Sequence, residues 1–149
     1  MRPASRTLQI PASRNAEECF RCKADRMPIR CLIVDDNRPY LEAARVLLER
    51  EGLTVAGVAT TGKEALRQAK ALHPDVVLVD ISLGDENGFD LARQLVEDGV
   101  GADATVVMIS TRAEEDVADL LAESPAAGFV PKAELSAAAI RRLVDGRLR

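Results

Sequence analysis

The chain has 149 residues, of which 47% are hydrophobic and 30% are charged, and its formal net charge at pH 7 is −4. This length and composition are typical of one globular domain with a single core, and they argue against two domains. No apolar run approaches the roughly 18 residues of a membrane span, and no apolar secretory segment opens the chain, so we expect a cytoplasmic protein with no membrane partner.

Charge is distributed unevenly along the chain. Residues 1–27 carry six basic and three acidic residues, whereas the remainder carries 14 basic and 21 acidic residues. An acidic body argues against direct nucleic-acid binding, which depends on neutralised phosphates. Residues 1–27 show no periodicity and predict a flexible N-terminal extension, with the folded domain at 28–149. Cys19 and Cys22 in this extension could form half a zinc site or a redox pair, but no second cysteine pair is present.

Short apolar runs alternate with helical patterns through the rest of the chain. The predicted strands are 29–34, 54–59, 76–79, 105–109 and 128–130. The first helix has Asn37 as its N-cap, Pro39 in its first turn and Gly52 just past its end. Four more helices are predicted: one capped by Thr61 and running to Ala71, one around 90–96 with a stop at Gly99, one from Glu114 to just before Pro125, and one over 135–144.

This alternation predicts an α/β protein with a parallel sheet. Right-handed crossovers place helices on both faces of such a sheet, which gives a three-layer, doubly wound sandwich. Because the carboxyl ends of parallel strands meet at one edge, ligands bind in the crevice outside that edge. Functional side chains are therefore expected directly after the strands.

Acidic residues stand at two of these strand ends. Asp35 and Asp36 follow the first strand, and Asp80 follows the run Val76–Val79 in the third. If the two strands are neighbours, three carboxylates share one pocket and repel one another unless a cation joins them. A hard divalent ion such as Mg²⁺ prefers oxygen ligands. The pattern therefore indicates a magnesium site and phosphate chemistry.

Two further strand ends carry polar groups, Ser110 after the fourth strand and Lys132 after the fifth, and Gly88 closes the loop after the third strand. Taken in order, these groups resemble the response-regulator receiver domain of two-component signalling, the CheY-like superfamily, over about residues 28–147. The resemblance implies a flavodoxin-like (βα)5 sandwich with a five-stranded parallel sheet of order 2-1-3-4-5. The residues that carry it are Asp35, Asp36, Asp80, Ser110 and Lys132.

The resemblance also implies how the site works. Asp80 would accept a phosphoryl group from a phosphohistidine on a sensor histidine kinase or phosphotransfer protein. Asp36 and Asp80 would bind Mg²⁺ directly, Asp35 would bind it directly or through water, and the backbone carbonyl of Ser82 would complete the protein ligands. Without Mg²⁺, the transfer should stall.

The remaining groups would read the phosphoryl group and switch the molecule. Lys132 would pair with it as a point charge, and the Ser110 hydroxyl would donate a hydrogen bond to it. Ser110 would then move, Phe129 would turn inward, and the effector-binding face would change. That face comprises 113–123, 128–130 and the last helix. A homodimer through it is left open.

Some features depart from many relatives. Leu83 and Gly84 replace a Met-Pro pair after Asp80, which predicts a more mobile loop, and Pro131 precedes Lys132 instead of a proline following it. Whether the chain is a single-domain regulator or a receiver cut from a longer protein is left open.

The sequence fits two alternative functions less well. An aspartyl phosphatase has an acid two residues after its nucleophile, where this chain has Ser82. A degenerate receiver that binds partners without phosphorylation usually lacks an acidic or lysine position, and none is lacking here. We therefore expect a phospho-accepting switch with at most slow autophosphorylation and autodephosphorylation, rather than an enzyme.

Overall fold

The computed structural model describes residues 28–99 and 104–148. The predicted extension at 1–27, with its pair Cys19 and Cys22, lies outside the described residues. Within the described part of the chain, none of the helices combines the length and the apolar character that a membrane crossing requires.

The core of the fold is a five-stranded parallel sheet, as predicted. Each strand begins and ends within one residue of its predicted bounds. Numbered by chain position among these five strands, the order across the sheet is 2-1-3-4-5, again as predicted. The strands across the sheet are β3 (Thr54–Ala59), β2 (Arg30–Val34), β4 (Val76–Asp80), β7 (Thr105–Ser110) and β8 (Gly128–Pro131).

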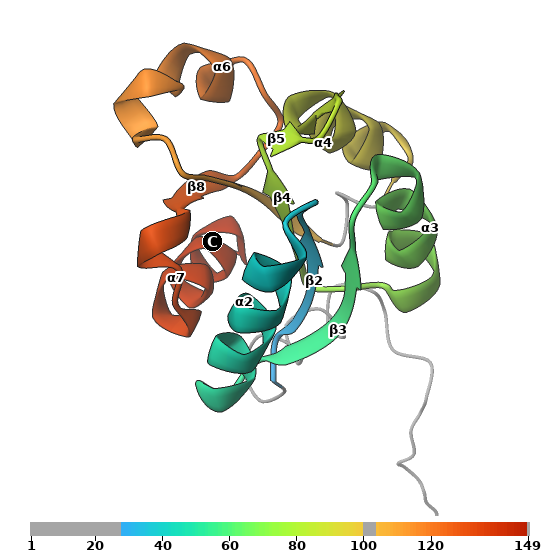
Figure 1. Ribbon diagram of the computed structural model, residues 1–149, viewed down its shortest axis with the longest axis vertical. Coiled ribbons are helices and arrows are strands. Elements are labelled where there is room, and N and C mark those ends of the chain that lie inside the picture. The colour runs from blue at the N-terminus through green and yellow to red at the C-terminus, as the bar shows by residue number, and fades with distance from the viewer. Residues whose placement is uncertain (1–27, 100–103, 149) are drawn as a thin grey trace, which may run out of the picture.

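Helices cover both faces of this sheet (Figure 1). One hydrophobic cluster joins the sheet to α3 (Gly62–Leu72) and α4 (Gly88–Glu97), and a second joins it to α2 (Arg38–Arg50) and α7 (Ala137–Leu148). Successive β2 residues point into opposite clusters, because strand side chains alternate. The central strands are therefore buried on both sides, and only their ends can present polar groups.

Side-chain caps set where three helices begin. The Asn37 side chain accepts a hydrogen bond from the Tyr40 backbone N–H at 3.0 Å and caps α2, and Thr61 caps α3 in the same way. Both caps were predicted. Asn87 caps α4 through the Phe89 N–H at 2.8 Å, so this helix begins earlier than expected. Short polar side chains at N-caps satisfy N–H groups that the helix leaves unpaired.

The prediction of one continuous helix from Glu114 to just before Pro125 was wrong. The segment forms a 3-10 turn, η1 (Glu114–Asp116), followed by α6 (Ala118–Ala122). Between them the Val117 N–H bonds to the Glu114 carbonyl at 3.1 Å, and the Val117 side chain is buried in the core. Burying this valine tightens the turn and interrupts the helix, because tertiary packing outweighs local helix propensity.

The loop after β4 forms a small hairpin that the sequence analysis did not predict. β5 (Ser82–Leu83) pairs with β6 (Glu86–Asn87) across a turn that contains Gly84. Gly84 has φ of +56°, which favours glycine, and a Cβ at this position would lie 3.4 Å from Asp36 Oδ2. The hairpin turn therefore packs beside the acidic cluster, in the segment predicted to be a mobile loop.

The hairpin also contacts α3. The Glu86 carboxylate accepts hydrogen bonds from the Gly62 N–H, at 3.0 Å from Oε1 and 3.3 Å from Oε2. Because the bond involves a charged acceptor at a helix N-terminus, Glu86→Ala should lower the free energy of unfolding by about 1 kcal/mol. Glu86→Gln keeps an acceptor oxygen and should lose less. Urea unfolding of the three proteins tests this, and an alanine variant as stable as wild type would refute the contact's role.

Candidate functional site

The sheet topology brings the predicted site residues to one edge. β4 lies between β2 and β7, and β8 lies beyond β7. In the ladders Asp80 is the partner of Ile109, and Ser110 is the partner of Pro131, which precedes Lys132. Since all five strands are parallel, the residues that follow them share the same edge. Asp35, Asp36, Asp80, Ser110 and Lys132 all lie there.

Three carboxylates form the centre of this edge. Asp35, Asp36 and Asp80 each offer one oxygen, and these oxygens lie within 4.8 Å of one another. Asp35 and Asp80 are buried, whereas Asp36 is exposed. A set of hard oxygen donors with one side open to solvent suits a divalent cation of the Mg²⁺ class, which keeps part of its water shell. The cluster therefore could hold such an ion.

Lys132 provides positive charge to the two buried acids. Its Nζ lies 2.5 Å from Asp35 Oδ2 and donates a hydrogen bond to Asp80 Oδ2 at 3.3 Å. The other Asp35 oxygen, Oδ1, accepts a hydrogen bond from the Asn37 N–H at 2.9 Å. The Lys132 side chain is only 11% exposed, so solvent screens these charges weakly. Asp35 is thus held between a lysine and the start of α2.

The environment of Asp80 shifts its ionisation. Burial, and next the charge of Asp35, raise the pKa of Asp80 from 3.8 to about 6, while the Lys132 ammonium and the Ser82 N–H act in the opposite direction. The Ser82 N–H donates to Asp80 Oδ1 at 3.3 Å. At pH 7 the Asp80 carboxylate is mostly ionised, and its negative charge is kept in the pocket at an energetic cost. Such a carboxylate can act as a nucleophile.

Gly88 permits α4 to begin directly against the strand end. A Cβ at Gly88 would lie 2.1 Å from the Asp80 carbonyl oxygen, and the Gly88 N–H bonds to the Ile81 carbonyl at 2.8 Å. Only glycine allows this close backbone approach. The predicted role of Gly88 in closing the loop after Asp80 agrees with this geometry.

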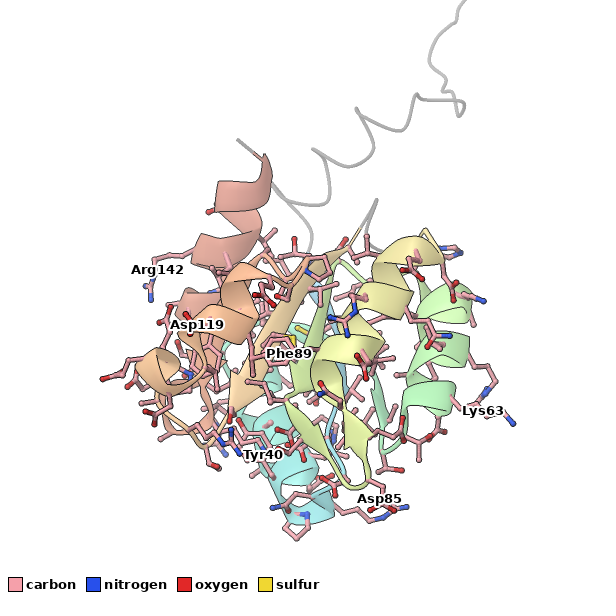
Figure 2. The ribbon with its side chains drawn as sticks, turned by 90° about the horizontal axis from the view of Figure 1, so that it is seen from above. Tyr40, Lys63, Asp85, Phe89, Asp119 and Arg142 are labelled. Carbon is pink, nitrogen blue, oxygen red and sulfur yellow. The ribbon has the colours of Figure 1, made fainter. Side chains whose placement is uncertain are left out.

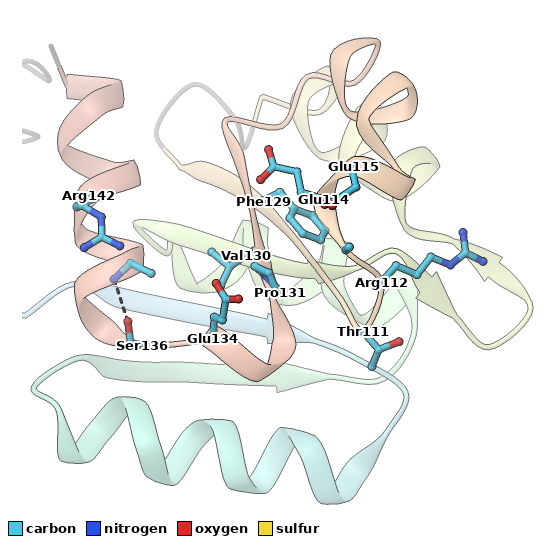
Figure 3. Close-up of a pocket in the computed structure, with 12 residues that line it drawn as sticks. Thr111, Arg112, Glu114, Glu115, Phe129, Val130, Pro131, Glu134, Ser136 and Arg142 are labelled. Atoms are coloured by element: carbon cyan, nitrogen blue, oxygen red, sulfur yellow. Dashed lines mark hydrogen bonds between the residues drawn. The ribbon is translucent and has the colours of Figure 1, made fainter.

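The two predicted switch residues lie next to a surface groove. The Ser110 side chain is buried, and its Oγ accepts a hydrogen bond from the Arg112 N–H at 3.0 Å. Phe129 is half-buried and lines a groove of about 530 Å³ between η1, β8 and α7. Figure 3 shows its ring beside Glu114 at this groove. The groove lies on the face predicted to meet an effector.

Tyr40 is a site residue that the sequence analysis missed. Its ring centroid lies 4.6 Å from Lys132 Nζ, and its hydroxyl donates to the Lys132 backbone carbonyl at 3.3 Å. The sequence offered one indication of its location: Tyr40 is three residues after the Asn37 cap, which places it on the first turn of α2. The direction of its side chain follows only from how α2 packs on the sheet.

The ionisation of Tyr40 gives a direct test of this placement. Burial, followed by the charges of Asp35 and Asp80, raises the pKa of Tyr40 from 10.0 to about 12. The chain has one tyrosine and no tryptophan. The tyrosinate absorbance of the folded protein at pH 10 should therefore stay well below that of the urea-unfolded protein. Equal absorbance in the two states would place Tyr40 outside the acidic pocket.

Residues 31–144 match the family model described as the response regulator receiver domain. Response regulator GacA from Pseudomonas viridiflava is 34% identical over 105 residues, which are 70% of this chain and 48% of GacA. Chemotaxis protein CheY from Thermotoga maritima is 29% identical over 69% of this chain and 84% of CheY. The chain thus spans about half the length of its GacA relative.

Solved structures agree with the sequence relatives. The signal receiver domain of the response regulator NarL from Mycobacterium tuberculosis has a TM-score of 0.71 and 26% identity, over 80% of this chain and 98% of that domain. A LuxR-family response regulator from Aurantimonas has a TM-score of 0.69 and 27% identity, over 80% of this chain and 86% of that one. By its matched residues and its sheet order, this chain belongs to the response regulator receiver family.

Proposed function

We propose that this chain is a phospho-accepting switch of a two-component phosphorelay, with its receiver domain at 28–149 and an N-terminal extension at 1–27. Asp80 receives a phosphoryl group from a phosphohistidine on a sensor histidine kinase or phosphotransfer protein. The observation that supports this most strongly is that the Lys132 ammonium and the carboxylates of Asp35 and Asp36 converge beside Asp80. The chain acts as a switch and not as an enzyme, and we propose a cytoplasmic location for it.

In the proposed transfer, a carboxylate oxygen of Asp80 forms a new bond to phosphorus. The bond from phosphorus to the donor imidazole nitrogen breaks, and its electron pair stays on that nitrogen. Asp80 is ionised at pH 7 because its pKa, although raised, is about 6. The Ser82 N–H and the Lys132 ammonium hold the two Asp80 oxygens in place before the reaction.

We assign the metal ligands to the acidic cluster. Asp36 and Asp80 would bind Mg²⁺ directly, Asp35 directly or through water, and the Ser82 backbone carbonyl would complete the set. The cluster fits this role, since its three carboxylate oxygens lie within 4.8 Å of one another. When bound, the ion supplies positive charge that offsets the repulsion between the carboxylate and phosphoryl oxygens. Receiver domains typically bind Mg²⁺ at such an acidic pocket.

After transfer, the surrounding residues respond to the new charge. Before transfer, the Lys132 ammonium donates to the Asp80 carboxylate and the Ser110 hydroxyl accepts from the Arg112 N–H. After transfer, each of these two side chains donates a hydrogen bond to a phosphoryl oxygen. Phe129 then turns inward and reshapes the groove beside η1, β8 and α7, where a downstream effector or a second copy would bind. A hydrogen bond that forms in only one of two conformations increases the population of that conformation.

Labelling with a small phosphodonor tests the proposal. With Mg²⁺ and acetyl phosphate, the intact mass of wild type should increase by one phosphoryl group, and that of Asp80→Asn should not change. Excess EDTA should suppress labelling, because the proposed transfer needs the divalent ion. Asp90→Asn, at an exposed position on α4, serves as the matched control and should label like wild type. Equal labelling of Asp80→Asn and wild type would exclude Asp80 as the acceptor.

A further inference from the structure

Tyr40 contacts Lys132 at two separate points. The ring lies under the ammonium, with 4.6 Å between the centroid and Nζ, and the hydroxyl donates to the Lys132 backbone carbonyl at 3.3 Å. One tyrosine therefore touches both the charged end and the main chain of the same lysine. A cation over an aromatic face is attracted by the ring quadrupole, and the attraction is stronger where water is excluded.

These contacts belong to a closed circuit of interactions. The Asp35 carboxylate binds the Asn37 N–H, the Asn37 side chain binds the Tyr40 N–H, and Tyr40 binds Lys132. The circuit closes where the Lys132 ammonium pairs with Asp35. It connects the start of α2 with the end of β8, two elements far apart in sequence. Figure 2 shows Tyr40 on α2 at the edge of the molecule where Asp85 of the hairpin also lies.

We infer that Tyr40 is a positioning residue that holds the Lys132 ammonium beside Asp80 and ready for the phosphoryl group. This inference rests on the proposed function of Asp80. A lysine side chain has four rotatable carbon–carbon segments and reaches many positions when it is unrestrained. The ring confines its charged end on one side and the carboxylates confine it on the other. The hydroxyl fixes the main chain from which the side chain extends.

A purely structural role for Tyr40 leads to different expectations. The ring also packs against the hydrophobic cluster that α2 and α7 form with the sheet, so its removal could act through packing alone. In that case any effect would be independent of Lys132. If Tyr40 acts through the lysine, its effect depends on the ammonium being present, and a double-mutant cycle separates the two cases.

The first measurement is the rate of labelling by acetyl phosphate in the presence of Mg²⁺. Tyr40→Leu removes both contacts and should slow labelling about fivefold or more, as expected for the loss of a largely desolvated cation–π contact. Tyr40→Phe keeps the ring and should recover most of the rate. In a Lys132→Met background, Tyr40→Leu should cause no further loss. The inference would be overturned if Tyr40→Leu were labelled as fast as wild type. It would also be overturned if Tyr40→Leu slowed labelling by the same factor in the Lys132→Met background.

The second measurement requires neither metal nor phosphodonor. Urea unfolding of wild type, Tyr40→Leu, Lys132→Met and the double variant should show that the two substitutions are not additive. Additive changes would refute the coupling, even if Lys132→Met is labelled too slowly to follow. Labelling that survives Asp80→Asn would instead refute the proposed function, and this outcome would leave a measured coupling between Tyr40 and Lys132 intact.

Discussion

Replacing Lys132 with methionine should lower the free energy of unfolding at pH 7 by about 3 kcal/mol when no divalent ion is present. The ammonium lies 2.5 Å from a fully buried Asp35 oxygen and 3.3 Å from an oxygen of Asp80. Its removal leaves two like charges together in a region that is largely closed to solvent. The methionine keeps much of the apolar stem, so the loss reports on charge more than on packing.

A divalent ion should reduce this loss. If the acidic cluster binds Mg²⁺, the ion supplies positive charge close to the position that Lys132 leaves. Urea unfolding of wild type and Lys132→Met, in EDTA and again in Mg²⁺, measures the effect. Lys63→Met, at an exposed position on α3, is the matched control and should change stability little. An equally small loss for both lysine variants in EDTA would show that Lys132 does not compensate the buried acids.

Replacing Asp80 with asparagine should have the opposite effect and raise the free energy of unfolding of the metal-free protein. The pKa of Asp80 is about 6 in the folded protein against an ordinary value of 3.8. The folded state therefore binds the proton more tightly than the unfolded state. The stability that this gives is fully present below pH 3.8, and it is lost as the pH rises through 6. At pH 7 the charged Asp80 costs about 2 to 3 kcal/mol.

The gain from Asp80→Asn should accordingly depend on pH. In EDTA, the stability difference from wild type should be largest above pH 6 and should shrink as the pH falls toward 4. Saturating Mg²⁺ should reduce it at pH 7, because wild type then gains binding energy that the variant loses. Asp119→Asn, at an exposed position on α6, is the control. A difference that stays constant from pH 4 to pH 8 would contradict the raised pKa of Asp80.

Most of the sheet could be predicted because its strands are buried on both faces. The runs Cys31–Val34 and Val76–Val79 are continuous apolar segments that end in acids, and this pattern determines both the strands and the edge that carries chemistry. The caps Asn37 and Thr61 were also recognisable, since they depend only on local sequence. Features determined by local pattern or by full burial were thus predictable.

Features that depend on tertiary packing were not predictable from the sequence. The break at Val117 arises because its side chain enters the core, although the acids before it favour a helix start. The β5–β6 hairpin depends on Gly84 adopting a positive φ beside Asp36. Tyr40 reaches Lys132 only because α2 and the end of β8 meet in space. In each case the decisive partner lies outside the local sequence pattern.

Chemical trapping of the labelled protein tests the central claim most directly. Borohydride reduces an aspartyl phosphate to homoserine, so treatment after labelling with acetyl phosphate and Mg²⁺, followed by peptide mass analysis, identifies the acceptor among the three clustered acids. We expect homoserine at position 80 and unchanged aspartate at positions 35 and 36. Homoserine at position 35 or 36, or no homoserine in a labelled protein, would contradict the assignment of Asp80 as the phosphoryl acceptor.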